Sequence, residues 1–169
     1  MIQRLRVPLG FVVAAAVLYL ATPRAITILI GLPIAIAGGL LRAMAAGTIR
    51  KDSKLATAGP YAWTRNPLYF GSFLLTVGFA IMSASWIAAL ILIIPSLVIY
   101  PNVIRNEEKH LEKLFPEDFR RYRDRVPRFI PKPGQFERSF SFKQYLANRE
   151  YNTAIGFAAV LAVFILKSL

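Results

Sequence analysis

Long runs without a single charged residue constrain this chain more than any other feature. Seventeen uncharged residues separate Arg6 from Arg24, another seventeen separate Arg24 from Arg42, and sixteen separate Glu150 from Lys167. At about 1.5 Å per residue such a helix is about 25 Å long, slightly less than the hydrocarbon thickness of about 30 Å. Each run therefore predicts a short transmembrane helix that is completed by flanking residues or by local thinning of the bilayer.

The longest uncharged run covers the 39 residues from 66 to 104 and is too long for one crossing. It predicts a helical hairpin with its turn at Ser83-Ala84-Ser85 and with Trp86 at the membrane interface. Pro23 makes a poor cleavage context for a signal peptide, so the first run is predicted to be a retained helix. The expected fold is an all-α, polytopic membrane helix bundle of about five short transmembrane helices with a cytoplasmic helical and extended cap. The expected spans are about 7–23, 25–47, 67–83, 86–104 and 151–168.

Composition supports a membrane protein, because 56% of the 169 residues are hydrophobic while the net charge is +12. So much apolar material leaves too little polar surface to cover a soluble globule, and it excludes a disordered chain. Five crossings would place 19 of the 21 basic residues and all nine acidic residues on one side. The positive-inside rule makes that side cytoplasmic, together with the N-terminus and the catalytic face, and leaves the C-terminus outside.

Topology and attraction to anionic membrane lipids account for most of the net charge. No soluble module with base-stacking aromatic residues is evident, so no nucleic-acid partner is expected. The chain has no cysteine and only one histidine, His110, so no metal site is expected either. On the helix that it is expected to share with Glu107 and Glu108, His110 lies off the apolar face and is interpreted as a solvated residue.

A stripe of small residues spaced four apart follows the second expected span. Such a face lets another helix approach closely, so it predicts a helix-packing surface rather than a ligand site. The stripe consists of Gly31, Ala35, Gly39, Ala43 and Gly47.

The first candidate for chemistry is the segment 59–71, at the entry to the third expected span. Pro67 suits the first turn of a helix, which makes Asn66 the expected N-cap and places Arg65 beside exposed amide donors. A helix N-terminus with an adjacent guanidinium can bind a carboxylate or a phosphate. The alternative is an interfacial belt in which Tyr61, Arg65 and Tyr69 anchor the helix at headgroup depth.

The second candidate is the segment 105–115, which continues the fourth expected span. Glu107 and Glu108 fall on the two shoulders of an apolar helical face, so both carboxylates point toward the protein at the membrane surface. Carboxylates in that position need cations, hydroxyl groups or amines as partners. Those partners are either a ligand or a structural cation such as Arg65 or Arg105.

A short interfacial helix is expected after Pro116, followed by an extended segment over 126–134. Phe119, Tyr122 and Val126 share its apolar face, and four arginines surround that face as a basic rim toward lipid.

Taken together, the two candidate segments resemble the isoprenylcysteine carboxyl methyltransferase family and, in outline, the integral-membrane phospholipid methyltransferases. The family pattern is Gly-Pro-Tyr-x-x-x-Arg-His-Pro-x-Tyr-x-Gly at a helix entry, then Glu-Glu-x-x-Leu-x-x-x-Phe-Gly-x-x-Tyr-x-x-Tyr, then Arg-Val-Pro. The resemblance covers about residues 30–131 of a single domain, 1–169, in which 132–169 forms an interfacial linker and the last transmembrane helix. The matching positions are Gly59, Pro60, Tyr61, Arg65, Pro67, Tyr69, Gly71, Glu107, Glu108, Leu111, Phe115, Tyr122, Arg125, Val126 and Pro127.

Three positions depart from the family pattern. Pro116 replaces a glycine and Phe119 replaces the first tyrosine, which keeps a turn and an aromatic ring. Asn66 stands where the family has histidine, and an amide cannot titrate near neutral pH. If the chain is an active methyltransferase, no general base therefore operates at position 66.

The resemblance implies an S-adenosylmethionine-dependent methyltransferase whose lipid-like or isoprenoid-like acceptor enters from the bilayer. It implies a cytoplasmic cofactor pocket closed by residues 105–131, with Arg65 and the amides near Asn66 holding the cofactor carboxylate and with Glu107 and Glu108 taking its amine or ribose hydroxyl groups. A carboxylate acceptor is already ionised, so positioning and desolvation can supply most of the catalysis. The implied catalytic residues are Arg65, Asn66, Glu107 and Glu108, and the implied cofactor-binding residues are Tyr61, Arg65, Asn66, Pro67, Tyr69, Glu107, Glu108 and Tyr122.

Three alternatives remain open at this stage. A phospholipid N-methyltransferase would need a base for its amine, and Glu107 or Glu108 is available. A membrane reductase of the sterol reductase type uses a similar motif pair for NADPH. A non-catalytic membrane scaffold would explain Asn66 as a sign of degeneration.

Overall fold

The computed structural model describes residues 12–50 and 53–169, and this part of the chain contains helices and no strand. The expected all-α membrane helix bundle is confirmed. Residues 12–20 are helical, and a short 3₁₀ helix, η1, covers Gly59–Ala62. The remaining helices are α2 (Ala25–Thr48), α3 (Pro67–Met82), α4 (Trp86–Leu114), α5 (Pro116–Arg125), α6 (Phe142–Ala147) and α7 (Tyr151–Ser168).

Three of these helices, α2, α4 and α7, are long and apolar enough to cross a membrane, and α3 is a shorter apolar helix. Their bounds agree with the expected spans to within one residue, except that α4 continues ten residues beyond the expected end at 104 to Leu114. The start of the first expected span lies outside the described residues, as do Arg4, Arg6 and Lys51.

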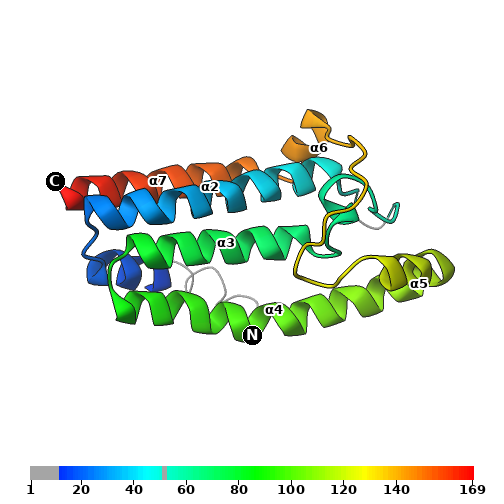
Figure 1. Cartoon of the computed structure of the whole chain (residues 1–169), viewed down its shortest axis with the longest axis horizontal. Helices are drawn as coiled ribbons and strands as arrows, with labels where there is room; N and C mark the ends of the chain where they lie inside the picture. Colours follow the sequence, from blue (N-terminus) through cyan, green and yellow to red (C-terminus); the bar gives the residue numbers. More distant parts are fainter. Residues whose placement is uncertain (1–11, 51–52) are drawn as a thin grey trace.

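The helices lie side by side, so the segments that connect them gather at two ends of the bundle (Figure 1). At one end, the amide of Thr22 donates to the carbonyl of Ser83 (2.8 Å), and Lys167 Nζ donates to the carbonyl oxygens of Leu18 (2.7 Å) and Ala21 (2.6 Å). The other end carries η1, α5, α6 and the C-terminal part of α4 (Figure 1). We call this second end the polar end, because it holds the candidate segments.

Helices α2 and α3 are in close backbone contact. A Cβ atom added to Gly31 would lie 2.5 Å from the carbonyl oxygen of Gly78, and one added to Gly38 would lie 2.6 Å from that of Gly71. The predicted packing role is thus confirmed at Gly31. It is wrong at Gly39, where an added Cβ would meet nothing within 4 Å, because the contact face of the helix passes through Gly38 instead.

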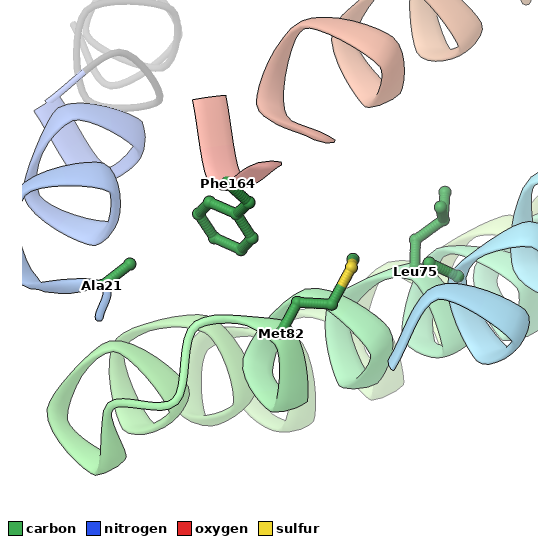
Figure 2. Close-up of a cluster of buried hydrophobic side chains, with 5 residues drawn as sticks. Ala21, Leu75, Met82 and Phe164 are labelled. Carbon is green, nitrogen blue, oxygen red and sulfur yellow. The ribbon is translucent and has the colours of Figure 1, made fainter. Parts of the chain in front are cut away.

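A small apolar core fills the space between α2, α3 and α7 at the end opposite the polar end. Ala21, Leu75, Met82 and Phe164 are buried there (Figure 2). Phe79 extends this core with an edge-to-face ring contact to Phe164, at a centroid distance of 6.1 Å. These contacts join the last helix to the α2–α3 pair.

A partly buried ion pair joins the helices nearer the polar end. The guanidinium of Arg42, on α2, binds the carboxylate of Glu150 through two contacts of 2.7 and 2.9 Å, directly before α7 begins. It also donates to the hydroxyl of Ser72 on α3 and to that of Thr153 on α7. One arginine therefore holds three helices together, a role the sequence alone does not indicate.

The linker before α7 packs against the polar end. Gly59 donates its amide to the carbonyl of Glu137 (3.0 Å), and Ser141 donates its amide to that of Gly47 (2.9 Å). Asn148 donates its side-chain amide to the carbonyls of Ala46 (2.7 Å) and Ile49 (3.1 Å), which satisfies acceptors left unpaired at the C-terminus of α2.

Candidate active site

The sequence predicts only part of the conformation of the segment that leads into α3. Gly59 has a φ of +59°, in the left-handed region that favours glycine, and Pro67 occupies the first turn of α3 as expected. Asn66 is at the N-cap position, but its side chain makes no capping hydrogen bond. The expected N-cap position of Asn66 is therefore confirmed, while its side-chain amide nitrogen donates to the carbonyl of Arg128 (2.8 Å).

The extended segment 127–132 runs beside the entry to α3 and is fastened to it by backbone and side-chain hydrogen bonds. Arg65 donates its amide to the carbonyl of Pro127, and Lys132 donates its amide to that of Trp63, both at 2.9 Å. The fully buried hydroxyl of Thr64 donates to the carbonyl of Phe129 (2.9 Å). These hydrogen bonds hold the segment that carries Arg128 beside Arg65.

Glu108 lies between two arginines. Its Oε1 atom is 3.1 Å from Arg65 Nη2, and its Oε2 atom is 2.8 Å from Arg128 Nη2 and 2.9 Å from Arg128 Nε. The side chains of Arg65 and Glu108 are both less than 10% exposed, whereas that of Arg128 is half-exposed. Of the two structural cations considered from the sequence, Arg65 rather than Arg105 therefore pairs with Glu108, and Arg128 is an addition.

Glu107 has a different environment from its neighbour. The hydroxyl of Tyr69 donates to Glu107 Oε2 at 2.9 Å, which joins α3 to α4. Because the two glutamates point to different sides of one apolar face, one carboxylate is engaged by arginines and the other by a phenol.

These side chains surround a cavity of about 280 Å³ at the polar end. Seven of the eight residues predicted to bind the cofactor line it, and the eighth, Pro67, is buried at the start of α3. The structure brings the seven together, while their part in binding stays a prediction. The seven are Tyr61, Arg65, Asn66, Tyr69, Glu107, Glu108 and Tyr122.

Two buried phenols and the arginine have shifted pKa values. Burial raises the pKa of Tyr61, and the Glu107 carboxylate raises it further; burial likewise raises the pKa of Tyr122. The hydroxyl of Tyr122 donates to the carbonyl of Tyr61 at 2.7 Å. Burial lowers the pKa of Arg65, while Glu108 acts in the opposite direction. Both phenols therefore stay neutral at physiological pH and can donate hydrogen bonds.

Some hydrogen-bonding capacity in the cavity wall is unused. Within the described part of the chain, three buried polar atoms have no hydrogen-bond partner, namely the hydroxyl of Tyr61, Nε of Arg65 and Oε1 of Glu108. For Glu108 Oε1 the nearby guanidinium compensates the charge without meeting hydrogen-bond geometry. Buried polar atoms are rarely left unpaired in proteins, so the hydroxyl of Tyr61 and Nε of Arg65 indicate where a polar ligand would bind.

Several residues of the site escaped prediction. Arg128 follows the matched Arg-Val-Pro positions, and it is this arginine, not the exposed Arg125, that reaches Glu108. The cavity wall also includes described residues on both sides of positions 51–52, among them the buried Leu55, which packs on Phe119 of α5. No local sequence pattern indicates the hydrogen bond of Thr64, because its acceptor is a carbonyl 65 positions away. The additional polar residues at the cavity are Arg50, Lys54 and His110.

The fold and the site define a class before any relative is considered: a helical membrane protein with a charged, phenol-lined cavity at one end of its bundle. Residues 40–118 match the phospholipid methyltransferase family. That family includes the isoprenylcysteine carboxyl methyltransferases, so the match confirms the resemblance stated from the motifs.

Three relatives with different descriptions match parts of the chain. The chain is 36% identical over 105 residues to the nickel-cobalt-cadmium resistance protein NccN of Alcaligenes xylosoxydans xylosoxydans and 32% identical over 105 residues to the cobalt-zinc-cadmium resistance protein CzcN of Cupriavidus metallidurans. It is 31% identical over 81 residues to the protein-S-isoprenylcysteine O-methyltransferase of Schizosaccharomyces pombe.

The matches are partial on both sides. They cover 62%, 62% and 48% of this chain and 49%, 48% and 34% of the respective relatives, so the chain spans about half or less of their lengths. No solved structure matches. Within residues 12–50 and 53–169, no group of three or more His, Cys, Asp or Glu side chains could hold a metal ion.

Proposed function

We propose that this chain is an S-adenosylmethionine-dependent methyltransferase that acts on a lipid-like acceptor embedded in the membrane. The observation that carries the proposal is the cavity at the polar end, where seven side chains predicted from the family motifs meet. The family match over 40–118 and the similarity to an isoprenylcysteine O-methyltransferase support the reaction class.

The residues at the cavity fit the cofactor by the chemistry of their donors and acceptors. S-adenosylmethionine carries a carboxylate, an amine, ribose hydroxyl groups and a sulfonium. Arg65, supported by Arg128, would hold the carboxylate, and Glu107 would hold the amine, because each then meets the opposite charge. The unpaired hydroxyl of Tyr61 would bond a ribose hydroxyl. The π-faces of Tyr69 and Tyr122 suit the adenine or the sulfonium.

Glu108 receives a modified role in this proposal. Both of its oxygens already lie within 3.1 Å of a guanidinium nitrogen, so it orients Arg65 and Arg128 rather than acting as the main ligand of the amine. Asn66 orients the same region, because it holds the carbonyl of Arg128. Positioned, partly desolvated groups of this kind are effective because they need no reorganisation during the reaction.

When bound, S-adenosylmethionine supplies a methyl group on sulfur, and its transfer to a carboxylate oxygen forms a methyl ester while the C–S electron pair returns to sulfur. The chain's residues have little proton transfer to perform in that case. Asn66 provides no base, and none is needed for an acceptor that is already ionised at neutral pH. An amine acceptor would have to lose a proton, for which Glu107 is the carboxylate at hand.

The acceptor is proposed to be a carboxylate-bearing amphiphile that is O-methylated, with the polar end in the cytoplasm, as the positive-inside rule predicts. The substrates implied by the family are carried by the bilayer, and the cavity is lined by residues of the polar end of the bundle.

The test is to add methyl-labelled S-adenosylmethionine to membranes that contain the full chain and to recover labelled lipid. O-methylation gives label that mild alkali releases as methanol, whereas an alkali-stable label indicates N-methylation of a phospholipid. Absence of labelled lipid together with NADPH binding to the purified protein would favour a reductase. If neither cofactor binds to the folded protein, the chain is a scaffold and the proposal is wrong.

A further inference from the structure

We infer that a second hollow, an apolar crevice between α3 and α4, binds the single apolar chain of the acceptor, and that Arg105 and Arg128 at this crevice select an anionic head group. The inference rests on the proposed function, because it names the acceptor class of the same reaction.

The crevice has the shape and composition expected for one hydrocarbon chain. Its volume is about 290 Å³, and its wall is almost entirely apolar. That volume is just below the range of about 300–1,000 Å³ for small-molecule sites, which suits one chain better than two. The wall comes from α3, from α4 and from the extended segment that carries Arg128, and it includes Phe73, Leu97, Ile104 and Phe129.

Two guanidinium groups are the charged groups of this largely apolar wall. Arg105 lies on α4 directly after the buried Ile104 and is exposed. Within residues 12–50 and 53–169, no carboxylate lies within ion-pair distance of Arg105. Arg128 is half-exposed, although it holds Glu108. A positive charge without a partner, beside an apolar crevice, complements an anionic head on an apolar chain.

The crevice and the cofactor cavity share a wall. Tyr100 lines the crevice and Tyr69 lines the cavity, and their ring centroids are 5.7 Å apart. Arg128 lines the crevice while its guanidinium binds Glu108, which lines the cavity. A head group bound by the two arginines would therefore lie at the boundary between the hollows, where a methyl group has to pass.

The two hollows also follow one another along the same helices. On α4, positions 97, 100, 101 and 104 line the crevice, and positions 107, 108 and 111 continue the same face into the cavity. From Tyr100 to Glu107 the helix rises about 10 Å. On α3, Phe73 lines the crevice and Tyr69, one turn earlier, lines the cavity. The helix pair thus forms one path from apolar to polar surroundings.

The experiment uses the full chain in nanodiscs of zwitterionic lipid and a matched pair of photoreactive probes, a fatty acid with a diazirine in its chain and the fatty alcohol with the same chain. Mass spectrometry locates the labelled peptides. The inference predicts that the acid labels the part of α4 around Leu97 and Tyr100 more strongly than the alcohol does. An excess of unlabelled fatty acid should compete with the acid probe, and a diacyl phospholipid should compete weakly.

Arg105→Gln tests head selection without touching a buried residue. It should lower labelling by the acid about tenfold, the loss expected for one charge-assisted hydrogen bond, and leave labelling by the alcohol unchanged. Arg121→Gln is the matched control, because Arg121 is exposed on α5 and pairs with Asp118 away from the crevice. Ser96→Phe fills the crevice wall and should block both probes, whereas Leu90→Phe on the exposed face of α4 should block neither.

The inference is overturned if acid and alcohol label α4 equally, if Arg105→Gln and Arg121→Gln behave alike, or if Ser96→Phe leaves the labelling unchanged in a folded protein. Binding of S-adenosylmethionine is measured on the same samples. If the cofactor binds but the crevice is not labelled, the inference fails alone; if the crevice is labelled but the cofactor does not bind, the proposed function fails alone.

Discussion

The two faces of α3 differ in how they meet their neighbours. Toward α2, glycines bring the backbones together, so that not even a methyl group fits between Gly38 and the carbonyl of Gly71. Toward α4, the contact is made by aromatic rings, as between Tyr69 and Tyr100, and both helices contribute residues to the cavity and to the crevice. One face of the helix therefore packs closely against its neighbour, and the other borders the two hollows.

The difference explains why a small bundle can hold a polar site. The polar groups of the α4 side are fixed by bonds to distant segments, such as those from Thr64 and Asn66 to the segment 127–129. Small residues on the other side, and the ion pair of Arg42 with Glu150, hold α3 in place. We expect substitutions on the α2 side to reduce stability first and those on the α4 side to reduce binding first.

Glu108→Gln is expected to have the largest effect, because it removes the charge that compensates two arginines. We expect cofactor affinity to fall by more than about a hundredfold, since Arg65 and Arg128 lose their orientation. The free energy of unfolding should fall by about 3 kcal/mol, the low end of the range for breaking a buried ion pair, because Arg128 is half-exposed. Binding assays and chemical unfolding measure the two effects; no change in either would contradict the assigned role of Glu108.

The neighbouring glycines of α2 provide a matched test of the support face. Gly38→Ala places a methyl group against the backbone of α3 and should lower the free energy of unfolding by about 1–3 kcal/mol. Gly39→Ala points into open space and should cause no loss. Unfolding of both variants in detergent makes the comparison, and equal stabilities would mean that α2 and α3 do not pack in this register.

Asn66 tests whether a hydrogen bond or a titrating group matters at this position. Asn66→His can still donate to the carbonyl of Arg128 and should retain activity. Asn66→Leu removes that hydrogen bond and leaves the carbonyl of Arg128 only the longer one from the hydroxyl of Thr64 (3.3 Å), so we expect a loss of about 1 kcal/mol of stability and reduced methyl transfer. Methyl-transfer rates and unfolding of both variants decide this, and full activity of the leucine variant would remove Asn66 from the site.

Substitution of Tyr61 should have the smallest effect, a change in stability that is seen only at alkaline pH. Its raised pKa means that the folded protein keeps a proton above about pH 10, where an unfolded tyrosine loses it, so stability falls as the pH rises. Tyr61→Phe should weaken that decline and leave neutral stability nearly unchanged, because the hydroxyl has no partner within the described residues. Unfolding temperatures from about pH 8 to pH 11 measure it. Tyr19→Phe, at an exposed position, is the control, and identical profiles for the two variants would contradict the burial of Tyr61.

The bounds of the helices could be predicted from the sequence because they depend on local signals. Pro67 and Trp86 mark helix starts that the structure reproduces, and uncharged runs set the lengths. The sequence also contains a local signal for the start of α6. Ser141 is the N-cap residue of this helix, and its side chain accepts a hydrogen bond from the amide of Gln144.

The contacts between segments could not be predicted in the same way. The family motifs pointed to Arg65 and Glu108, yet their direct ion pair depends on where α3 places the end of α4. The addition of Arg128 and the pairing of Arg42 with Glu150 join residues that are 20 and 108 positions apart. Such pairs are determined by how the helices and segments pack, and no periodic pattern in the sequence indicates them.

Binding of labelled S-adenosylmethionine to the purified full chain and to Glu107→Gln tests the central claim most directly. Glu107→Gln keeps an acceptor for Tyr69 and removes only the charge. We expect binding to the original chain, a loss of affinity of about 10- to 100-fold in Glu107→Gln with unchanged unfolding, and no loss in Lys109→Gln on the exposed side of the same helix. Failure of the folded original chain to bind at millimolar concentration, or equal affinities of the two variants, would contradict the assignment of this cavity to the cofactor.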